Sequence, residues 1–292
     1  MREGPIRILL QTTIPPARDD WSIARFGLLR DLLAGATDAE GAPLYAVEAR
    51  DRGPRGTPDP VLARLDESDF DQLWLFAVDI GDGLTEEDCI GVSRFREAGG
   101  GMLVTRDHMD LGSSVCTLGG VGLAHHFHSR NPEPDTSRHV RDDEETQAIS
   151  WPNYRSGANG DYQVIRPLAP IHPVLVDPSS PTGILRYLPA HPHEGAVVAP
   201  EGADARAIMT GCSRTTGRDF NLAVAFEGGA QGGRAIAEST FHHFTDYNWD
   251  LSRGCPTFVS EVPGDGMARE PRALADTHRY VLNIAAWLGQ RP

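Results

Sequence analysis

Short apolar runs alternate with longer stretches of helical spacing along the first third of the chain. The runs at residues 6–11, 44–49, 71–78 and 102–105 have the length and apolar content of buried strands. The third run, DQLWLFAV, is apolar on both faces, as are strands of parallel sheets that are covered on both sides. Apolar positions over 23–33, and a start at Thr85 followed by three acidic residues, predict the intervening helices.

The pattern changes in the middle of the chain and then recovers. From Arg106 to Gln163 there is little periodicity, and Gly, Pro, Asn, Asp and His are abundant. A loop-rich stretch of this length is often functional, although it could also be an insertion that covers a sheet edge. Further strands are predicted at 195–199, 206–209, 221–226 and 234–239, followed by a helix over 272–288.

The alternation of strands and helices predicts an α/β protein with a doubly wound, mainly parallel sheet. We expect a single domain over residues 1–292, with a long loop-rich insertion at about 106–163.

Charge and cysteine content narrow the classes of partner. The 292 residues include 27 Lys+Arg and 41 Asp+Glu, which gives a formal net charge of −14. An acidic surface repels phosphate backbones and anionic lipids, so we expect a small-molecule substrate and neither nucleic acid nor membrane as partner. The first residues lack a signal-peptide core, and the four cysteines show no C-x-x-C spacing. These features predict a cytoplasmic location.

Polar clusters follow two of the predicted strands. Residues 105–110 (TRDHMD) come after one strand, and residues 240–246 (TFHHFTD) come after another. Ligands of open parallel sheets bind beyond the carboxyl ends of strands. Because aspartate and histidine together can perform acid–base catalysis, we predict a catalytic centre of Asp107, His108 and His242. Arg106 would clamp an anionic or polar substrate group, or else pair with an acidic neighbour.

A metal is a second option for this chemistry. His126 and His128 alternate, so they would face the same side of an extended segment. Imidazole and carboxylate are ligands that transition metals accept. We therefore predict a divalent metal such as zinc, manganese or iron at His126, His128 and Asp110. Since no fixed ligand motif is present, the alternative is that these histidines satisfy backbone groups or cap loops.

Residues 151–162 (WPNYRSGANGDY) mix aromatic rings with amide and acidic groups. Sugars are bound by such mixtures, because their rings stack on aromatic side chains while their hydroxyls need polar partners. We assign substrate binding to Trp151, Asn153 and Tyr154, and also to His243 beside His242. The alternative is a lid that is packed by its own Trp and Tyr.

Three segments carry a resemblance to a known family. They are the glycines 99–101 followed by a strand, the segment 171–175 (IHPVL), and the segment 233–242 (GRAIAESTFH). With the final helix ending in AWLG, they resemble the ThuA-like (trehalose-utilisation) branch of the class I glutamine amidotransferase-like superfamily. The resemblance implies a flavodoxin-like fold and a sugar-related role, and it places His242 at the family's histidine.

The chain departs from that superfamily at the catalytic elbow. Amidotransferases carry a cysteine there, whereas this sequence has Arg106, Asp107 and His108. Glutamine hydrolysis through a cysteine is therefore not expected, and Cys116 is a weaker candidate nucleophile. The leading hypothesis is an enzyme acting on a small polar substrate, with a carbohydrate derivative as one candidate. The rival hypothesis is a non-catalytic ligand-binding or assembly protein. Either protein could form a homo-oligomer.

Overall fold

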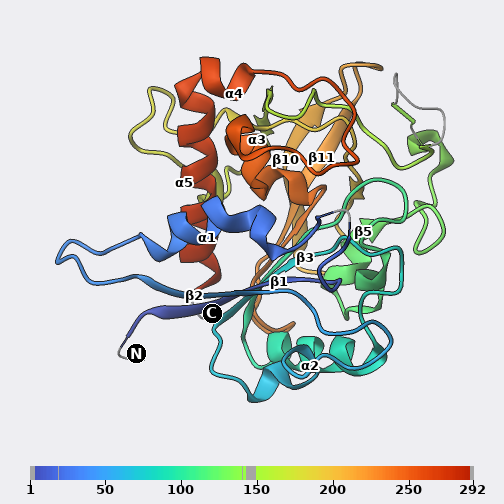
Figure 1. Cartoon of the computed structure of the whole chain (residues 1–292), viewed down its shortest axis with the longest axis vertical. Helices are drawn as coiled ribbons and strands as arrows, with labels where there is room; N and C mark the ends of the chain where they lie inside the picture. The colour runs from blue at the N-terminus through green and yellow to red at the C-terminus, as the bar shows by residue number, and fades with distance from the viewer. Residues whose placement is uncertain (1–3, 19, 140, 143–148, 290–292) are drawn as a thin grey trace.

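A single eight-stranded sheet forms the centre of the computed structural model, which describes residues 4–18, 20–139, 141–142 and 149–289 (Figure 1). The strand order is β2-β1-β3-β4-β12-β11-β10-β7. The four pairings from β2 to β12 are parallel, and the three from β12 to β7 are antiparallel. The strands are β1 (Ile6–Thr12), β2 (Tyr45–Arg50), β3 (Gln72–Phe76), β4 (Gly101–Val104), β7 (Arg166–Pro167), β10 (Ala205–Cys212), β11 (Asp219–Phe226) and β12 (Ala235–Glu238).

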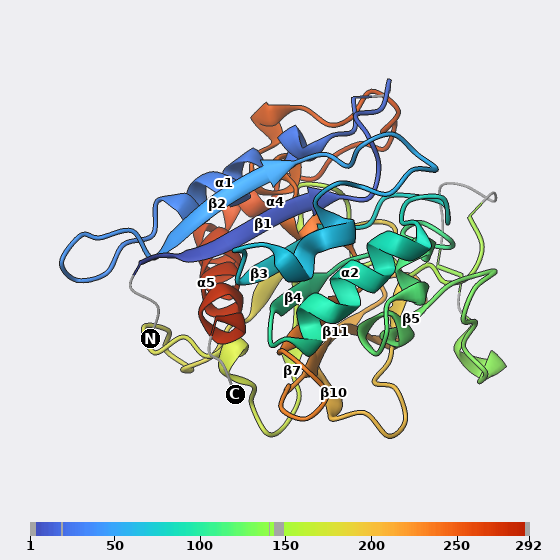
Figure 2. The same cartoon turned by 90° about the horizontal axis from the view of Figure 1, so that it is seen from below.

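Helices cover both faces of this sheet, as Figure 2 shows. Helices α1 (Gly27–Ala34) and α5 (Pro271–Leu288) pack on one face, and α2 (Glu86–Glu97) packs on the other. The sequence of β3 is apolar on both faces because the strand is covered on both sides. Trp74 contributes to the core under α1 and α5, and Leu73 contributes to the core under α2. The predicted α/β class with a mainly parallel sheet is confirmed.

The start of α2 follows the prediction made at Thr85. Its hydroxyl oxygen accepts a hydrogen bond from the Asp88 amide at 3.2 Å, and the Asp88 carboxylate accepts one from the Thr85 amide at 2.9 Å. This reciprocal arrangement satisfies amide groups that lack partners within the helix. Asp88 also pairs with Arg52 at 2.6 Å, and both side chains are fully buried.

The prediction of a single helix over 23–33 is wrong for its first turn. A 3₁₀ helix, η1 (Ile23–Phe26), precedes α1. The amide of Leu28 at the start of α1 donates to Asp246 Oδ1 at 2.8 Å. The chain can therefore begin the α-helix at Gly27, because a carboxylate more than two hundred residues away caps it.

Glycines at the start of β4 and β12 allow a close approach of backbones. A Cβ atom on Gly233 would lie 2.1 Å from the carbonyl oxygen of Gly100, and one on Gly101 would lie 2.7 Å from that of Leu288. Gly101 and Gly233 are thus required by packing between β4, β12 and the end of α5.

The stretch 106–163 contains only short elements in its described part. They are η3 (Ser113–Thr117), η4 (Val121–Ala124), β5 (His125–His126), η5 (Thr136–Arg138) and the start of β6 (Tyr162–Val164). Strand β5 pairs with β9 (Ala196–Val197), and β6 pairs with β8 (Tyr187–Pro189). The strand predicted at 195–199 therefore exists, but it lies outside the main sheet.

The remaining short elements connect the larger ones: η2 (Leu62–Glu67), η6 (Pro173–Leu175), η7 (Phe241–Phe244), α3 (Asp246–Trp249), η8 (Leu251–Arg253) and α4 (Gly266–Arg269). Within the described ranges, none of the helices has the length and apolar character that crossing a membrane requires.

Acid should destabilise the protein through His125 in β5. Its side chain is completely buried, and burial, aided by the charge of Arg106, lowers its pKa to about 3. Because the folded pKa lies below the unfolded value near 6.5, the contribution to stability is complete above about pH 6.5 and is lost as the pH falls towards 3. At pH 5 the loss should be about 2 kcal/mol, from ~1.4 kcal/mol per pH unit.

Urea unfolding at pH 7 and pH 5 checks this expectation. The stability difference between the two pH values should be about 2 kcal/mol smaller in His125→Leu than in the wild type. The exposed His128, replaced in the same way, serves as the control and should leave the difference unchanged. Equal pH dependence in all three proteins would show that His125 is not held uncharged.

Candidate functional site

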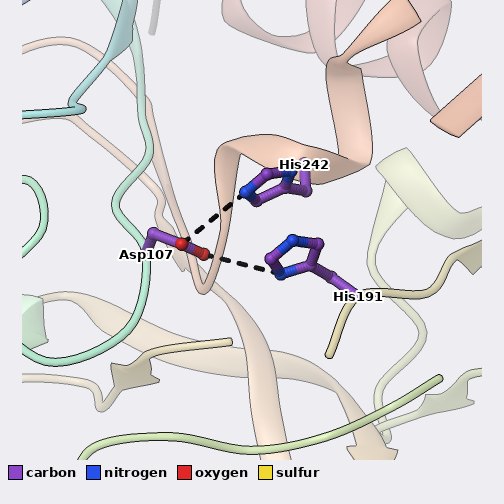
Figure 3. Close-up of side chains that lie close together, drawn as sticks. All are labelled: Asp107, His191 and His242. Atoms are coloured by element: carbon purple, nitrogen blue, oxygen red, sulfur yellow. Dashed lines mark ion pairs between the residues drawn. The ribbon is translucent and has the colours of Figure 1, made fainter. Parts of the chain in front are cut away.

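The predicted catalytic residues meet at the carboxyl edge of the sheet. Asp107 and His108 follow β4, and His242 lies in η7, which follows β12. Strands β4 and β12 are parallel neighbours, so the segments after them leave the sheet at the same edge. The loop between β8 and β9 brings His191 to the same place, and Figure 3 shows the Asp107 carboxylate facing both imidazoles from one side.

The carboxylate of Asp107 is the centre of this cluster. Its Oδ1 accepts a hydrogen bond from the Thr240 hydroxyl at 2.8 Å, and its Oδ2 lies 2.9 Å from Nδ1 of His108. Nε2 of His242 is 3.6 Å from Oδ2, and Nδ1 of His191 is 3.9 Å from Oδ1. Asp107, His191 and His242 are each at most 5% exposed.

The two buried imidazoles are held by contacts on their outer sides. Their rings stack, with centroids 3.3 Å apart and planes inclined by 12°. Nδ1 of His242 is hydrogen-bonded to the Tyr247 hydroxyl at 2.6 Å, and Nδ1 of His191 lies 2.5 Å from the carbonyl oxygen of His193. These contacts restrict the rotation of both rings.

The electrostatics favour an ionised Asp107 carboxylate and lower the pKa of the two buried imidazoles, His191 and His242. Burial alone would raise the pKa of Asp107, but His242 and His108 hold it well below its usual range. Burial lowers the pKa of His191 well below its usual range, and His242 adds to this effect. Burial also lowers the pKa of His242, although Asp107 opposes the shift. Burial keeps Tyr247 protonated by raising its pKa.

Solvent approaches the cluster on the side of His108. This side chain is 18% exposed, and its ring lies 5.1 Å from that of His193. Nε2 of His193 is 3.4 Å from a carboxylate oxygen of the partly exposed Glu261. A substrate would therefore meet His108 and His193 before it reached His191 or His242.

A second buried cluster, Glu194–His243–Glu238, adjoins the first, because His243 follows His242 in the chain. Nε2 of His243 is 3.4 Å from Glu194 and its Nδ1 is 3.1 Å from Glu238. Glu194 also accepts hydrogen bonds from Gln163, Ser239 and Ser156, and Glu238 accepts one from Tyr280. Burial opposes a charge on His243, but the two glutamates outweigh it and raise its pKa to about 10. Burial raises the pKa of Glu238.

Arg106 is placed differently from the predicted substrate clamp. Its side chain is fully buried, and its guanidinium donates to the carbonyl oxygens of Asp107, His126, Met109 and Ala196. The group also lies 4.0 Å from the ring centroid of Phe127. Its described hydrogen bonds thus tie backbone segments together, which favours a structural role over both the clamp and the alternative salt bridge.

The residues predicted as metal ligands do not converge. Nδ1 of His126 bonds to the Asn131 carbonyl at 2.7 Å, and Nδ1 of His128 lies 3.2 Å from the Trp151 carbonyl. Asp110 accepts from the Ser129 amide at 2.9 Å. Each side chain satisfies a different backbone group, as the alternative interpretation expected. Among the residues that the structure describes, the group with the spacing of a metal site is instead Asp107, His191 and His242.

The residues predicted to bind substrate occupy three different environments. Trp151 and Tyr154 line a cavity of about 440 Å³, in which Tyr154 stacks on Phe220 at 4.6 Å. Asn153 is buried, and its Oδ1 lies 3.3 Å from Nδ1 of His193 beside the cluster. His243 is 1% exposed within the Glu194–His243–Glu238 cluster, so it is out of reach of a substrate.

Sequence reasoning missed His191, His193, Glu194 and Tyr247. The first three stand in the segment 191–195 (HPHEG), where two histidines alternate and a glutamate follows. The same alternation drew attention to His126 and His128, so the signal was present. Nothing in the local sequence indicates that this loop reaches the end of β4.

No family model and no curated protein matches the chain. Solved structures do resemble it. A ThuA-like protein from Parabacteroides merdae has a TM-score of 0.51 at 16% identity, covering 98% of this chain and 91% of that one. The glutaminase domain of CTPS from Trypanosoma brucei, with bound acivicin, has a TM-score of 0.43 at 13% identity, covering 98% of both chains. At this identity the likeness to the first shows a shared fold and no more.

Proposed function

We propose that this protein is an enzyme that acts on a small polar substrate by His/Asp acid–base chemistry. The observation that carries the proposal is the pair of Asp107 and His108. A buried, ionised carboxylate lies 2.9 Å from Nδ1 of a histidine that is partly open to solvent. A carboxylate in this position fixes the imidazole tautomer and stabilises the imidazolium that forms when the other nitrogen takes a proton.

The residues have distinct roles in this proposal. Nε2 of His108 takes a proton from a hydroxyl of the substrate or from water, while Asp107 holds the ring. His193, 5.1 Å away, borders the space that the substrate would occupy. A carbohydrate derivative is our candidate substrate, and the cavity lined by Trp151 and Tyr154 would be a separate binding place for it, because no residue of the Asp107 cluster lies in its wall.

A cysteine nucleophile has little support among the described thiols. Cys212 and Cys255 are free, and burial raises the pKa of both thiols, which disfavours the reactive thiolate. The side chain of Cys116 lies outside the described residues, so its prediction stays open. Free thiols such as those of Cys212 and Cys255 are typical of a reducing compartment, and we propose a cytoplasmic location on that basis.

One observation favours a non-catalytic ligand-binding protein as the second candidate. Asp107, His191 and His242 are almost completely buried, whereas the neighbouring His108 side chain is 18% exposed. In that case the same cluster would stabilise a bound state without turnover.

Replacing His108 by glutamine should lower kcat/KM by about 10²–10⁴-fold, the usual effect of removing a general acid or base. The substrate for this assay is the sugar, sugar acid or sugar ketone that raises the melting temperature most in a ligand screen and is converted on incubation. His128→Gln, an exposed histidine of the same loop region, should keep wild-type activity. Unchanged kcat/KM in His108→Gln would reject the proposed base, and binding without turnover would favour the second candidate.

A further inference from the structure

We infer that Asp107, His191 and His242 form a binding site for one divalent transition-metal ion. The inference rests on the proposed function in one respect: the ion would lie at the site proposed for catalysis. One ligand atom from each residue lies within 4.8 Å of the others, and the three come from segments after β4, before β9 and after β12. Two imidazoles and one carboxylate with open positions are a ligand set that suits iron(II), and imidazole also suits zinc.

The contacts around these three residues support ligation. Nδ1 of His242 bonds to Tyr247, and Asp107 accepts from Thr240. Ligands of protein-bound metals typically have such partners, which fix the tautomer of an imidazole. When Nδ1–H of His242 donates to the Tyr247 oxygen, the lone pair of Nε2 faces the carboxylate.

The surrounding charges are also compatible with a cation. The guanidinium of Arg106 is directed to backbone carbonyls, and the carboxylate of Asp107 is buried and faces His108, His191 and His242. The remaining coordination positions would face His108 and His193, the side nearest solvent. A site with open positions on its accessible side is the arrangement of catalytic metals, where water or a substrate oxygen completes the coordination.

Binding should change the packing of the two imidazoles. Their parallel rings, 3.3 Å apart, cannot both direct an in-plane lone pair at one ion without turning. We therefore expect the rings to unstack when the metal binds. Cobalt(II) reports on this directly, because its visible absorption depends on the number and type of its ligands.

The test uses the full chain, stripped with a chelator and then titrated with Zn²⁺, Mn²⁺, Fe²⁺ or Co²⁺. We expect one equivalent to bind, with a raised melting temperature and a visible spectrum for Co²⁺. His191→Gln and His242→Gln should each weaken binding by at least 100-fold. Tyr247→Phe keeps all three ligands and should weaken it by about 10–100-fold, as the loss of an orienting partner does. His126→Gln and His128→Gln are matched controls that should bind as the wild type does.

Two results would overturn the inference: no binding of any of the four ions at millimolar concentration, or equal binding by the wild type, His191→Gln and His242→Gln. The wild-type titration and the Tyr247→Phe variant keep the test decisive if a ligand variant fails to fold. Absence of binding, together with turnover by metal-free protein that depends on His108, would refute the metal site and leave the proposed function standing. Stoichiometric binding at these residues, with turnover unaffected in His108→Gln, would do the reverse.

Discussion

Replacing Asp107 by asparagine should lower kcat/KM by about 10⁴-fold while the protein stays folded, as expected when the carboxylate that orients a catalytic histidine is lost. The carboxylate lies 2.9 Å from Nδ1 of His108 and 3.6 Å from Nε2 of His242, and it accepts from Thr240. Asparagine has nearly the same shape. However, it presents an amide that can hold His108 in the wrong tautomer, and it cannot stabilise an imidazolium.

The control for this variant is Asp110→Asn in the same loop. Asp110 accepts from the Ser129 amide away from the cluster, so its replacement should leave kcat/KM within a few-fold of the wild type. Circular dichroism and the melting temperature would establish that both variants are folded. If Asp107→Asn kept near wild-type activity, neither acid–base catalysis at His108 nor a metal at Asp107 could be the source of the reaction.

Much of the fold and half of the site follow from local sequence. Strands β1, β3 and β4 are short apolar runs, and a parallel sheet puts the segments after β4 and β12 at one edge. That rule alone brings Asp107, His108 and His242 together, because each stands within a few residues of a strand end. The start of α2 at Thr85 could also be predicted, because its capping partner Asp88 lies only three residues away.

What the sequence did not predict depends on contacts between distant segments. His191 reaches Asp107 on a loop without periodicity, and α1 begins where it does because Asp246 caps it. His126 and His128 show the opposite error. Their alternation suggested a shared ligand, but each is held by a backbone carbonyl that only the folded loop supplies. Spacing along the chain indicates which side chains share a face. A metal site also requires ligands from other segments, and local spacing does not show where those segments lie.

Replacing His243 by alanine should destabilise the protein by about 3–5 kcal/mol, the range for breaking a buried ion pair by removing one partner. His243 is 1% exposed and lies between Glu194 and Glu238, which are both fully buried. With a pKa of about 10, its imidazolium compensates the negative charge in this cluster at neutral pH. Alanine would leave a buried carboxylate without a counter-charge, next to a cavity. Urea unfolding measures the loss, and His128→Ala is the control for an exposed histidine.

A neutral version of the cluster separates charge from packing. In the triple variant Glu194→Gln, His243→Gln and Glu238→Gln the buried charges are removed together, and replacing a whole buried ion set costs far less than removing one member. The triple variant should therefore be more stable than His243→Ala, although it changes three residues. It should also bind metal or substrate less tightly than the wild type, because Glu194 follows His191 and His193 in the same loop while His243 adjoins His242. The cluster would then contribute by holding the two histidine-bearing segments against each other.

If His243→Ala were as stable as the exposed control, His243 would be uncharged in the folded protein and the two segments would be held by their hydrogen bonds alone.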